Sequence, residues 1–584
     1  MEATYRMTIM GEEIMAFIRT VKVKTSSGAI EEYVRIVESC REGDRQKQRV
    51  IAHLGNIKSL KNDAKKIVNG LLRVVGEKPL TFASDGKLLR AKEYGVRFVV
   101  EALWDELGFN RLVTKGLRKS KADLDYGRWI RMMVVNKLSD PESKLGIFRW
   151  LHRVWWPGHG FQEEVCNESV NPEERLELSR GEVMKFYRAM DYLFKLKEEI
   201  ENHIYHLVRD LFHLEVDLIF YDLTSSYFEG EGPGDFAKEG YSRDHEPGKN
   251  QIVIGILLCN GMPIGHEVFE GSRVDKKTVK EISAKIKNQF KINRCIFVGD
   301  RGLISRENLK ELEDEKRVES ILALKRRRNR EVREVLCNKD RPLMFCRESE
   351  ELEWLETKGD EGIRYIICHN PSVEVEQKEQ REKNLALLEE ALKELQAKVN
   401  AMKRPSIKNV VKQVEEILTH KHGRRFIDYQ VDEKTRKLSF WRKEESLLLE
   451  EKLDGVYILR TREEALSPLE VIKAYKDLMI VERAFRTMKS SLELRPLRHH
   501  KADRVRSHVF ICVLAFFFTK YLEKKLKESK VSLSAEMAWE SLKNLSVGQL
   551  DFNGTTHSYV SEPTYYHKLI FKSLGLNSPN RTTL

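Results

Sequence analysis

Three carboxylates stand where otherwise apolar elements present an acid. Asp222 follows the apolar run Leu218–Tyr221, Asp300 comes after the run Arg294–Val298, and Glu482 lies at the edge of an apolar helix face. Several negative charges held close together require cations, and divalent ions with oxygen ligands, chiefly Mg²⁺, meet that need. Two such ions about 4 Å apart activate a water or a 3′-hydroxyl in phosphodiester chemistry. An Asp after a strand is also a common turn former, so each Asp alone stays open to that interpretation.

The stretch Ser467–Lys489 is predicted to form one helix that carries Glu482. It opens with Ser-Pro-x-Glu, which combines a capping box with a proline at the first helical position. The residues of its predicted buried stripe lie four, three, four and three apart: Ala474, Leu478, Val481, Phe485 and Met488. Tyr475, Glu482 and Lys489 recur every seventh residue and therefore share one edge of this face. A solvated Glu beside a solvated Lys is the alternative for this helix taken alone.

The two aspartates belong to a predicted sheet whose first strand is apolar on both faces. Strands are predicted at Val216–Asp222, Asn250–Leu258, Pro263–Phe269 and Arg294–Val298, and a helix at Val279–Phe290. The second and third strands flank an Asn-Gly turn, the strongest short hairpin signal. The first strand is expected to end at its Asp, and the fourth to lead directly into the other Asp.

Composition favours a basic protein of several domains. The chain has 584 residues, with 103 Lys and Arg against 91 Asp and Glu and a formal net charge of +12. This length predicts roughly three to five domains, and a basic excess favours nucleic acid or an anionic membrane as partner. The longest strongly apolar run, Val509–Phe518, is about half of what a membrane span needs, and no signal peptide is visible. We therefore expect a cytoplasmic protein without membrane contact.

Cysteine and histidine usage gives no sign of a zinc site. The eight Cys are scattered without a C-x-x-C pair, and several lie in apolar runs, so we expect reduced core residues. His420 and His422 have no further ligand pattern around them, and a loop is the expected setting.

The segments that flank the sheet are predicted from periodicity alone. Residues 17–57 alternate as a small β-meander, whose Lys and Arg suit either a phosphate backbone or a solvated face. Residues 60–212 are mostly helical, and the run Lys144–Trp156 mixes Trp with Arg and His, as a DNA-contacting helix or a core helix would. Glu374–Met402 forms a long charged helix, either a coiled-coil arm or one amphipathic helix on a sheet. The stretch Arg425–Tyr457 returns to strands.

The sequences around the three acids carry a known combination of motifs. Asp222 lies in FYDLTSSYFEG, Asp300 in FVGDRGLIS and Glu482 in YKDLMIVERAFRTMK. The stretch between Asp300 and Glu482 is longer than the stretch between Asp222 and Asp300, and it leaves room for an insertion. Together these motifs resemble a DDE transposase of a bacterial insertion sequence, over most of residues 20–525. The stretches GYSRDHEPGKNQIVIG and RPLRHHKADRVRSHVFICVLAF resemble the same group.

The resemblance extends to a signature on the Glu helix. The group has Tyr-x2-Arg-x3-Glu-x6-Lys and a β-rich insertion before the catalytic Glu. Tyr475, Glu482 and Lys489 fit this spacing, whereas Leu478 stands at the Arg position. If that Arg contacts DNA phosphate in relatives, its role is unfilled here or passes to another Arg of the helix.

The resemblance also implies roles for individual residues. Asp222 and Asp300 would bridge or flank two Mg²⁺ ions, for which Mn²⁺ can substitute, and Glu482 would complete one site. The residues implied to contact DNA are Tyr475, Lys489, Arg301, Arg483 and Arg486. His508 on the next helix is a weaker candidate, with a buried, hydrogen-bonded His as the alternative.

The implied function is transposition. The enzyme would cut double-stranded DNA at the terminal inverted repeats of its element and join the 3′-hydroxyl ends to target DNA, as a homodimer on the DNA. An RNase H-like nuclease without strand transfer, or a non-catalytic DNA-binding protein on a transposase scaffold, are the alternatives. A glycosidase with paired carboxylates is disfavoured, because cations around Glu482 do not assist an oxocarbenium-like transition state.

The fold class implied is α/β, with α+β character overall: an RNase H-like mixed-sheet core interrupted by a β-rich insertion with a helical arm. A small β-meander and a helical domain precede the core. The predicted segments are a β-rich N-terminal domain at 1–75, a helical domain at 76–212, the first part of the core at 213–320, the insertion at 321–466, the second part of the core at 467–530 and a C-terminal tail at 531–584.

Overall fold

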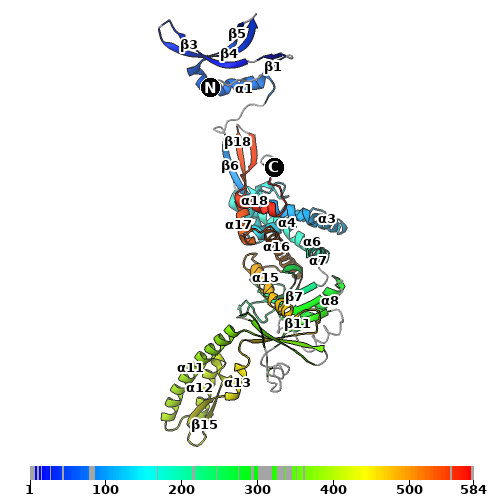
Figure 1. Ribbon diagram of the computed structural model, residues 1–584, viewed down its shortest axis with the longest axis vertical. Helices are drawn as coiled ribbons and strands as arrows, with labels where there is room; N and C mark the ends of the chain where they lie inside the picture. Colours follow the sequence, from blue (N-terminus) through cyan, green and yellow to red (C-terminus); the bar gives the residue numbers. More distant parts are fainter. Residues whose placement is uncertain are drawn as a thin grey trace. The chain divides into compact units, whose positions relative to one another are not determined.

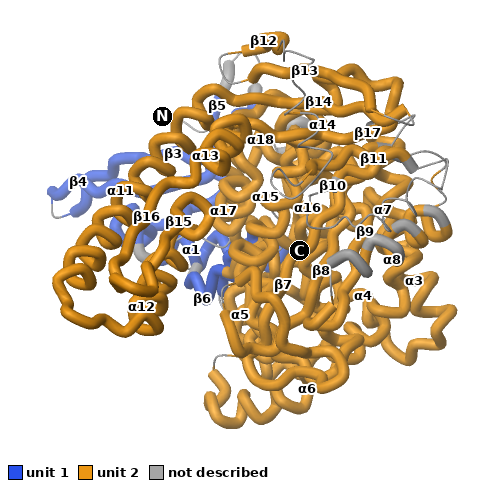
Figure 2. The backbone as a smooth tube through the Cα atoms, turned by 90° about the horizontal axis from the view of Figure 1, so that it is seen from below, with its two compact units in different colours: residues 1–91, 548–559, 584 blue, residues 92–547, 560–583 orange. Residues whose placement is uncertain are grey.

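The computed structural model describes most of the chain as helices and strands (Figure 1). The described residues are 7–9, 12–14, 16–26, 28–42, 45–77, 86–167, 169–212, 217–244, 246–273, 275–290, 292, 295–299, 318–324, 336, 345–349, 352–359, 362–552 and 555–580. Two compact units are distinguished, residues 1–91 with 548–559 and 584, and residues 92–547 with 560–583 (Figure 2). The six predicted segments stay a prediction.

The first unit is built on the predicted β-meander. Strands β3 (Ala16–Lys24), β4 (Ile30–Glu42) and β5 (Arg45–Asn56) form an antiparallel sheet, and α1 (Ile57–Val74) follows. Asn56 caps α1, since its side chain accepts a hydrogen bond from the Lys58 N–H at 2.9 Å. Short strands β1 (Met7–Ile9) and β2 (Glu12–Ile14) pair with each other, and a further sheet has the order β19-β18-β6. Its strands are β6 (Gly86–Glu93), β18 (Ser546–Phe552) and β19 (Thr555–Val560).

Among its described residues, the second unit holds a mixed sheet of nine strands, in the order β12-β13-β14-β17-β11-β10-β7-β8-β9. One half of this sheet comprises β7 (Asp217–Tyr227), β8 (Gln251–Cys259), β9 (Met262–Glu270), β10 (Cys295–Gly299) and β11 (Val318–Ala323). Strands β7, β8 and β9 are antiparallel, whereas β10 runs parallel to both β7 and β11. The β8–β9 turn is the predicted Asn-Gly turn, with φ of 48° at Asn260 and 78° at Gly261.

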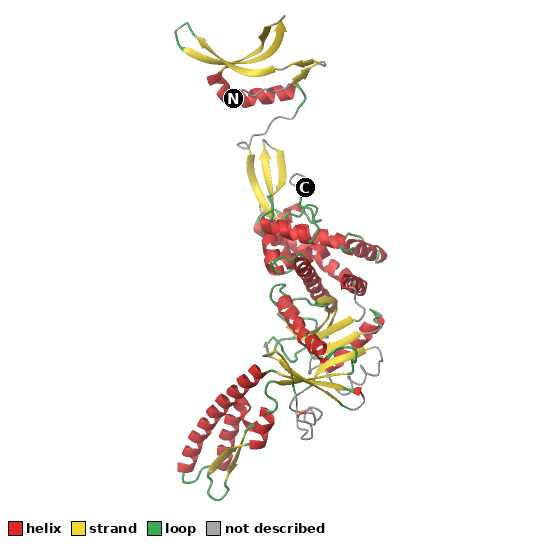
Figure 3. Cartoon of the chain, viewed as in Figure 1, coloured by secondary structure: helices red, strands yellow, loops and turns green. Residues whose placement is uncertain are grey.

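Strands from the insertion extend this same sheet beyond β11. They are β12 (Cys346–Ser349), β13 (Leu352–Lys358), β14 (Arg364–His369) and β17 (Val456–Thr461), all paired antiparallel. Between β14 and β17 the chain forms an arm of three helices and a hairpin (Figure 3). Its elements are α11 (Pro371–Ala401), α12 (Ile407–Thr419), the short turn η4 (His420–Arg425), β15 (Ile427–Val431), β16 (Leu438–Arg442) and α13 (Glu444–Glu451).

The arm has its own core, which decides between the two interpretations of the long helix. Leu385, Leu388 and Leu392 of α11 pack with Val414 of α12 and Leu438 of β16. The apolar face of α11 is therefore covered within the chain by a helix and a hairpin. This is the amphipathic-helix arrangement, and the seam is not left for a coiled-coil partner.

The described α-helices of this unit outside the arm are α2 (Gly95–Glu106), α3 (Phe109–Lys119), α4 (Gly127–Ser139), α5 (Ile147–Arg153), α6 (Pro172–Lys195), α7 (Lys197–Phe212), α8 (Asp275–Asn288), α14 (Pro468–Asp477), α15 (Met479–Lys489), α16 (Ala502–Glu528), α17 (Ala535–Lys543) and α18 (Tyr565–Ser573). Several of them pack against the sheet: α7 and α16 against β9, α15 against β7 and α14 against β11. By length and composition α16 could cross a membrane, but 83% of its most apolar window is buried inside the protein, as in a core helix. Trp150 and Trp156 are buried too, so the Trp-rich run belongs to the core.

The described Cys residues are free thiols, as predicted. Cys166, Cys259, Cys368 and Cys512 are buried, whereas Cys346 on the edge strand β12 is exposed and departs from the core expectation.

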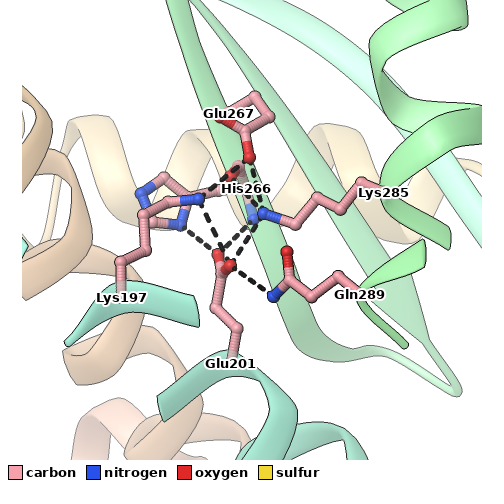
Figure 4. A network of polar contacts seen from close by, with 6 residues as sticks. All are labelled: Lys197, Glu201, His266, Glu267, Lys285 and Gln289. Carbon is pink, nitrogen blue, oxygen red and sulfur yellow. Dashed lines mark hydrogen bonds and ion pairs between the residues drawn. The ribbon is translucent and has the colours of Figure 1, made fainter. Parts of the chain in front are cut away.

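A buried polar network joins helices α7 and α8 to β9 (Figure 4). Glu201 accepts hydrogen bonds from Lys285 at 2.7 Å, from Lys197 at 3.2 Å and from the His266 backbone N–H at 2.9 Å. Glu267 lies at the rim and accepts from both lysines, at 2.6 and 2.9 Å. Burial would raise the pKa of Glu201, but the two lysines outweigh burial and hold that pKa well below its usual range. The network therefore fixes these helices to the nine-stranded sheet through charged groups.

Candidate active site

Asp222 lies within β7 and does not end the strand, contrary to prediction. Strand β7 continues to Tyr227 because β8 keeps pairing with it, with Asp222 opposite Ile256. Among the described residues, the last pair of β7 and β10 is Tyr221 with Gly299. Asp222 follows Tyr221 on β7 and is half-buried, and its Oδ1 accepts a hydrogen bond from the Leu223 N–H at 2.7 Å.

Asp300 and Arg301 lie outside the described residues. Gly299 is the last residue of β10, and Asp300 follows it in the chain. Neighbouring strands lie about 4.8 Å apart, so the end of the β7–β10 ladder is a place where two carboxylates can meet. The roles of Asp300 and Arg301 stay predictions.

Glu482 is exposed on α15, which packs against β7. The single helix predicted for this stretch is wrong, because the chain breaks at Leu478 into α14 and α15. The Leu478 N–H donates to the Tyr475 carbonyl at 3.0 Å and the Val481 N–H to the Leu478 carbonyl at 2.9 Å. These bonds span three residues and tighten the turn. The predicted capping box is confirmed at the start of α14.

Two of the three predicted acids line one cavity, which we call the catalytic cavity. It has a volume of about 440 Å³, and both Asp222 and Glu482 line it. The residues that share the cavity with these acids are Asn370, Val373, Gln377, Gly455, Val456, Tyr457, Tyr475, Lys476, Leu478 and Met479. Oxygen ligands from a strand and a helix thus face one space, a donor set that suits Mg²⁺ or Mn²⁺. Within the described part of the chain no three His, Cys, Asp or Glu side chains form a metal-binding group, and Asp300 is not in that part.

Part of the cavity wall comes from the two ends of the arm, which sequence reasoning missed. Asn370 caps α11, since its side chain accepts from the Val373 N–H at 3.2 Å, and its own N–H donates to the Gly455 carbonyl at 2.9 Å. Gly455 has a φ of 67°, and a Cβ there would lie 2.4 Å from the Asn370 carbonyl oxygen. Only glycine permits this approach. The Asn-Pro cap was visible in the sequence, but its place in the cavity that Asp222 lines was not.

Two predicted DNA contacts have partners within the protein. The Tyr475 ring stacks on that of Tyr457, with centroids 6.0 Å apart. Lys489 donates to Asp244 at 2.7 Å, and Arg495 donates to the same oxygen at 2.5 Å. The side chain of Asp244 is only 2% exposed and that of Lys489 11%. Burial lowers the pKa of Lys489, against the opposing effect of Asp244. A phosphate contact by Lys489 stays a prediction, and Asp244 is a partner that sequence reasoning did not find.

The remaining candidates differ in exposure. Arg483 and Arg486 are exposed on α15, where a DNA strand could reach them. His508 is buried, with Nε2 3.2 Å from the Leu494 carbonyl oxygen and Nδ1 3.4 Å from the ring of His499. Burial holds the pKa of His508 well below its ordinary value, so the ring is neutral. His508 is therefore the buried, hydrogen-bonded His that was the alternative to a DNA contact.

The sheet and its acids define the class of protein. An antiparallel β7–β8–β9 meander that continues into parallel β10 and β11, with a carboxylate beyond the β7–β10 ladder, is the RNase H-like arrangement. Residues 217–518 match the transposase DDE domain family, and residues 18–83 match the N-terminal domain of the IS1634 family transposases. No curated protein matches the chain. The first match spans more than half of the sequence, and the chain belongs to the DDE transposases of insertion sequences. DNA binding and divalent-metal chemistry are general properties of this family.

Proposed function

We propose that this transposase cuts DNA at the terminal inverted repeats of its element and joins the 3′-hydroxyl ends to target DNA, in the cytoplasm. The observation that carries the proposal is the shared cavity: Asp222 on β7 and Glu482 on α15, far apart in the sequence, line one space. Asp300 follows the strand paired with β7 in the sequence and would complete the set of three acids.

The described residues suggest how the site works. Asp222 and Glu482 would each hold a divalent ion through carboxylate oxygens, with Asp300 as the third ligand residue. Bound ions would activate the attacking hydroxyl and stabilise the leaving oxygen. Tyr475 and Lys476, which line the same cavity, would orient the scissile phosphate, and Arg483 and Arg486 would hold the adjacent backbone.

The N-terminal unit would recognise the repeats. Its match to a transposase N-terminal domain supports this role, as do the exposed Lys and Arg of its sheet, such as Arg19 and Lys22. Since an element has two ends and each chain contributes one set of acids, we expect a homodimer on the DNA.

A cleavage assay tests the proposal. Purified protein is incubated with labelled DNA that carries the flanking repeats, in Mg²⁺ or in EDTA. We expect Mg²⁺-dependent nicking at the repeat boundary, followed by strand transfer into a second DNA. Glu482→Gln should abolish both activities, whereas Glu464→Gln, which changes an exposed carboxylate outside the catalytic cavity, should retain them. Tight binding without cleavage in Mg²⁺ or Mn²⁺ would favour a non-catalytic DNA-binding protein, and nicking without strand transfer a nuclease.

A further inference from the structure

A second cavity in the arm adjoins the catalytic one. This arm cavity has a volume of about 300 Å³, and its polar lining includes Gln380 and Asn384 of α11 and Lys421 and His422 of η4. Gln377 lines both the arm cavity and the catalytic cavity. The polar face of α11 therefore leads from the catalytic carboxylates into the arm cavity.

The two η4 residues at this cavity adopt an unusual backbone. Lys421 has a φ of 48° and His422 a φ of 57°, both in the left-handed region that residues with a Cβ rarely occupy. Such conformations are costly and cluster at ligand-binding sites. Both side chains are exposed, and neither makes an ion pair or hydrogen bond with the residues that the structure describes. The backbone thus presents a cation and an imidazole without partners in the described part of the chain.

The charged groups deeper in the arm cavity are mostly neutralised. Arg381 pairs with Asp454 at 2.5 Å and Arg425 with Glu450 at 2.8 Å. The Nε atom of Arg381, whose side chain is 8% exposed, is buried without a hydrogen-bond partner among the described residues. A buried donor left in this state favours a ligand that brings an acceptor oxygen. Net positive charge at the cavity then comes from Lys421.

We propose that the arm cavity and the polar face of α11 from Gln377 to Asn384, together called the groove, bind the phosphate backbone of the DNA strand next to the scissile phosphate, with Lys421 as a phosphate contact. The inference rests on the proposed function and says which surface of the arm the bound DNA strand follows. Helix α11 rises about 1.5 Å per residue, so Gln377 and Asn384 lie about 10 Å apart along it. A strand of B-DNA advances about 3.4 Å per nucleotide. The groove therefore holds the backbone over about three nucleotides from the cleavage site, with Gln380 and Asn384 donating to its oxygens.

The first test compares two glycine substitutions in the arm. Lys421→Gly removes the ammonium while glycine keeps the left-handed backbone without penalty. Arg436→Gly is the matched control, because Arg436 has a φ of 56° and does not line the arm cavity. Binding of the full chain to repeat-end DNA is measured against salt concentration. Loss of one phosphate contact should lower the salt slope by about one and weaken binding about fivefold at 0.15 M salt, whereas Arg436→Gly should bind as the wild type does.

The second test locates the contact on the DNA. Single phosphates within six nucleotides of the cleavage site are replaced by neutral methylphosphonates. About three nucleotides from that site, replacement should weaken binding of the wild type but not of Lys421→Gly. Equal salt slopes for the two glycine variants would overturn the proposed binding of DNA in the groove. The same methylphosphonate profile in wild type and Lys421→Gly would overturn it too. In either case, Mg²⁺-dependent cleavage by the wild type would still uphold the proposed function. A wild type that neither binds nor cleaves repeat-end DNA would overturn both.

Discussion

Glu201 is predicted to carry much of the energy that fixes helices α7 and α8 to the catalytic sheet. Glu201→Gln keeps the shape of the side chain but removes the charge between Lys285 and Lys197, which are 6% and 11% exposed at their side chains. It also turns an amide donor toward groups that donate. Breaking a buried ion pair by changing one partner costs about 3–5 kcal/mol of stability. We expect the free energy of unfolding of Glu201→Gln to fall by an amount of this size.

Glu267→Gln is the matched control for this change. Glu267 accepts from the same two lysines, but its side chain is 32% exposed, against 1% for Glu201. Water can replace part of the lost interaction, so we expect Glu267→Gln to lower the free energy of unfolding by about 1 kcal/mol or less. Urea unfolding followed by tryptophan fluorescence reports on this unit, which contains Trp104, Trp129 and Trp150. The difference between the variants should move the urea midpoint by about 1 M. Equal midpoints for the two variants would refute the assigned role of Glu201.

Three further predictions follow from local geometry. The pKa of Glu201 is depressed in the folded state, so its contribution to folding stability is present above about pH 4.3 and is lost as the pH falls below that value. The difference in unfolding free energy between wild type and Glu201→Gln should therefore shrink as the pH falls through that range. A constant difference down to pH 3 would contradict this. Gly455→Ala should impair cleavage and lower stability, because its Cβ meets the Asn370 carbonyl oxygen; full activity would show that the cavity wall can shift. Lys489→Ala should destabilise the fold by about 3 kcal/mol because Asp244 keeps only one cation, and Lys489→Ala/Asp244→Asn should recover part of the loss in urea unfolding; no recovery would contradict the pairing.

Local signals in the sequence predicted many elements of the fold. The Asn-Gly turn at Asn260 and the capping box at Ser467 are short-range features, and both are present in the structure. The apolar run before Asp222 predicted a central strand because burial on both faces leaves no polar alternation. These features depend on residues close together in the chain.

What the sequence did not predict depends on distant partners. The end of the strand at Asp222 was placed wrongly because pairing with β8 continues to Tyr227. The break at Leu478 interrupts a stripe whose period fits a continuous helix, so the pattern alone gave no sign of it. Asn370 and Gln377 reach the catalytic cavity because the insertion extends the same sheet, and α11 begins at the end of one of its added strands.

The central claim is that Asp222 and Glu482 hold divalent metal at one site, and the most direct test counts bound ions. Mn²⁺ is titrated into the complex of the full chain with uncleavable repeat-end DNA, and free Mn²⁺ is measured by electron paramagnetic resonance. We predict two tightly held ions in the wild type and in Glu464→Gln, and fewer in Asp222→Asn and Glu482→Gln. The same number of ions in all four proteins would contradict the assignment of these carboxylates as metal ligands.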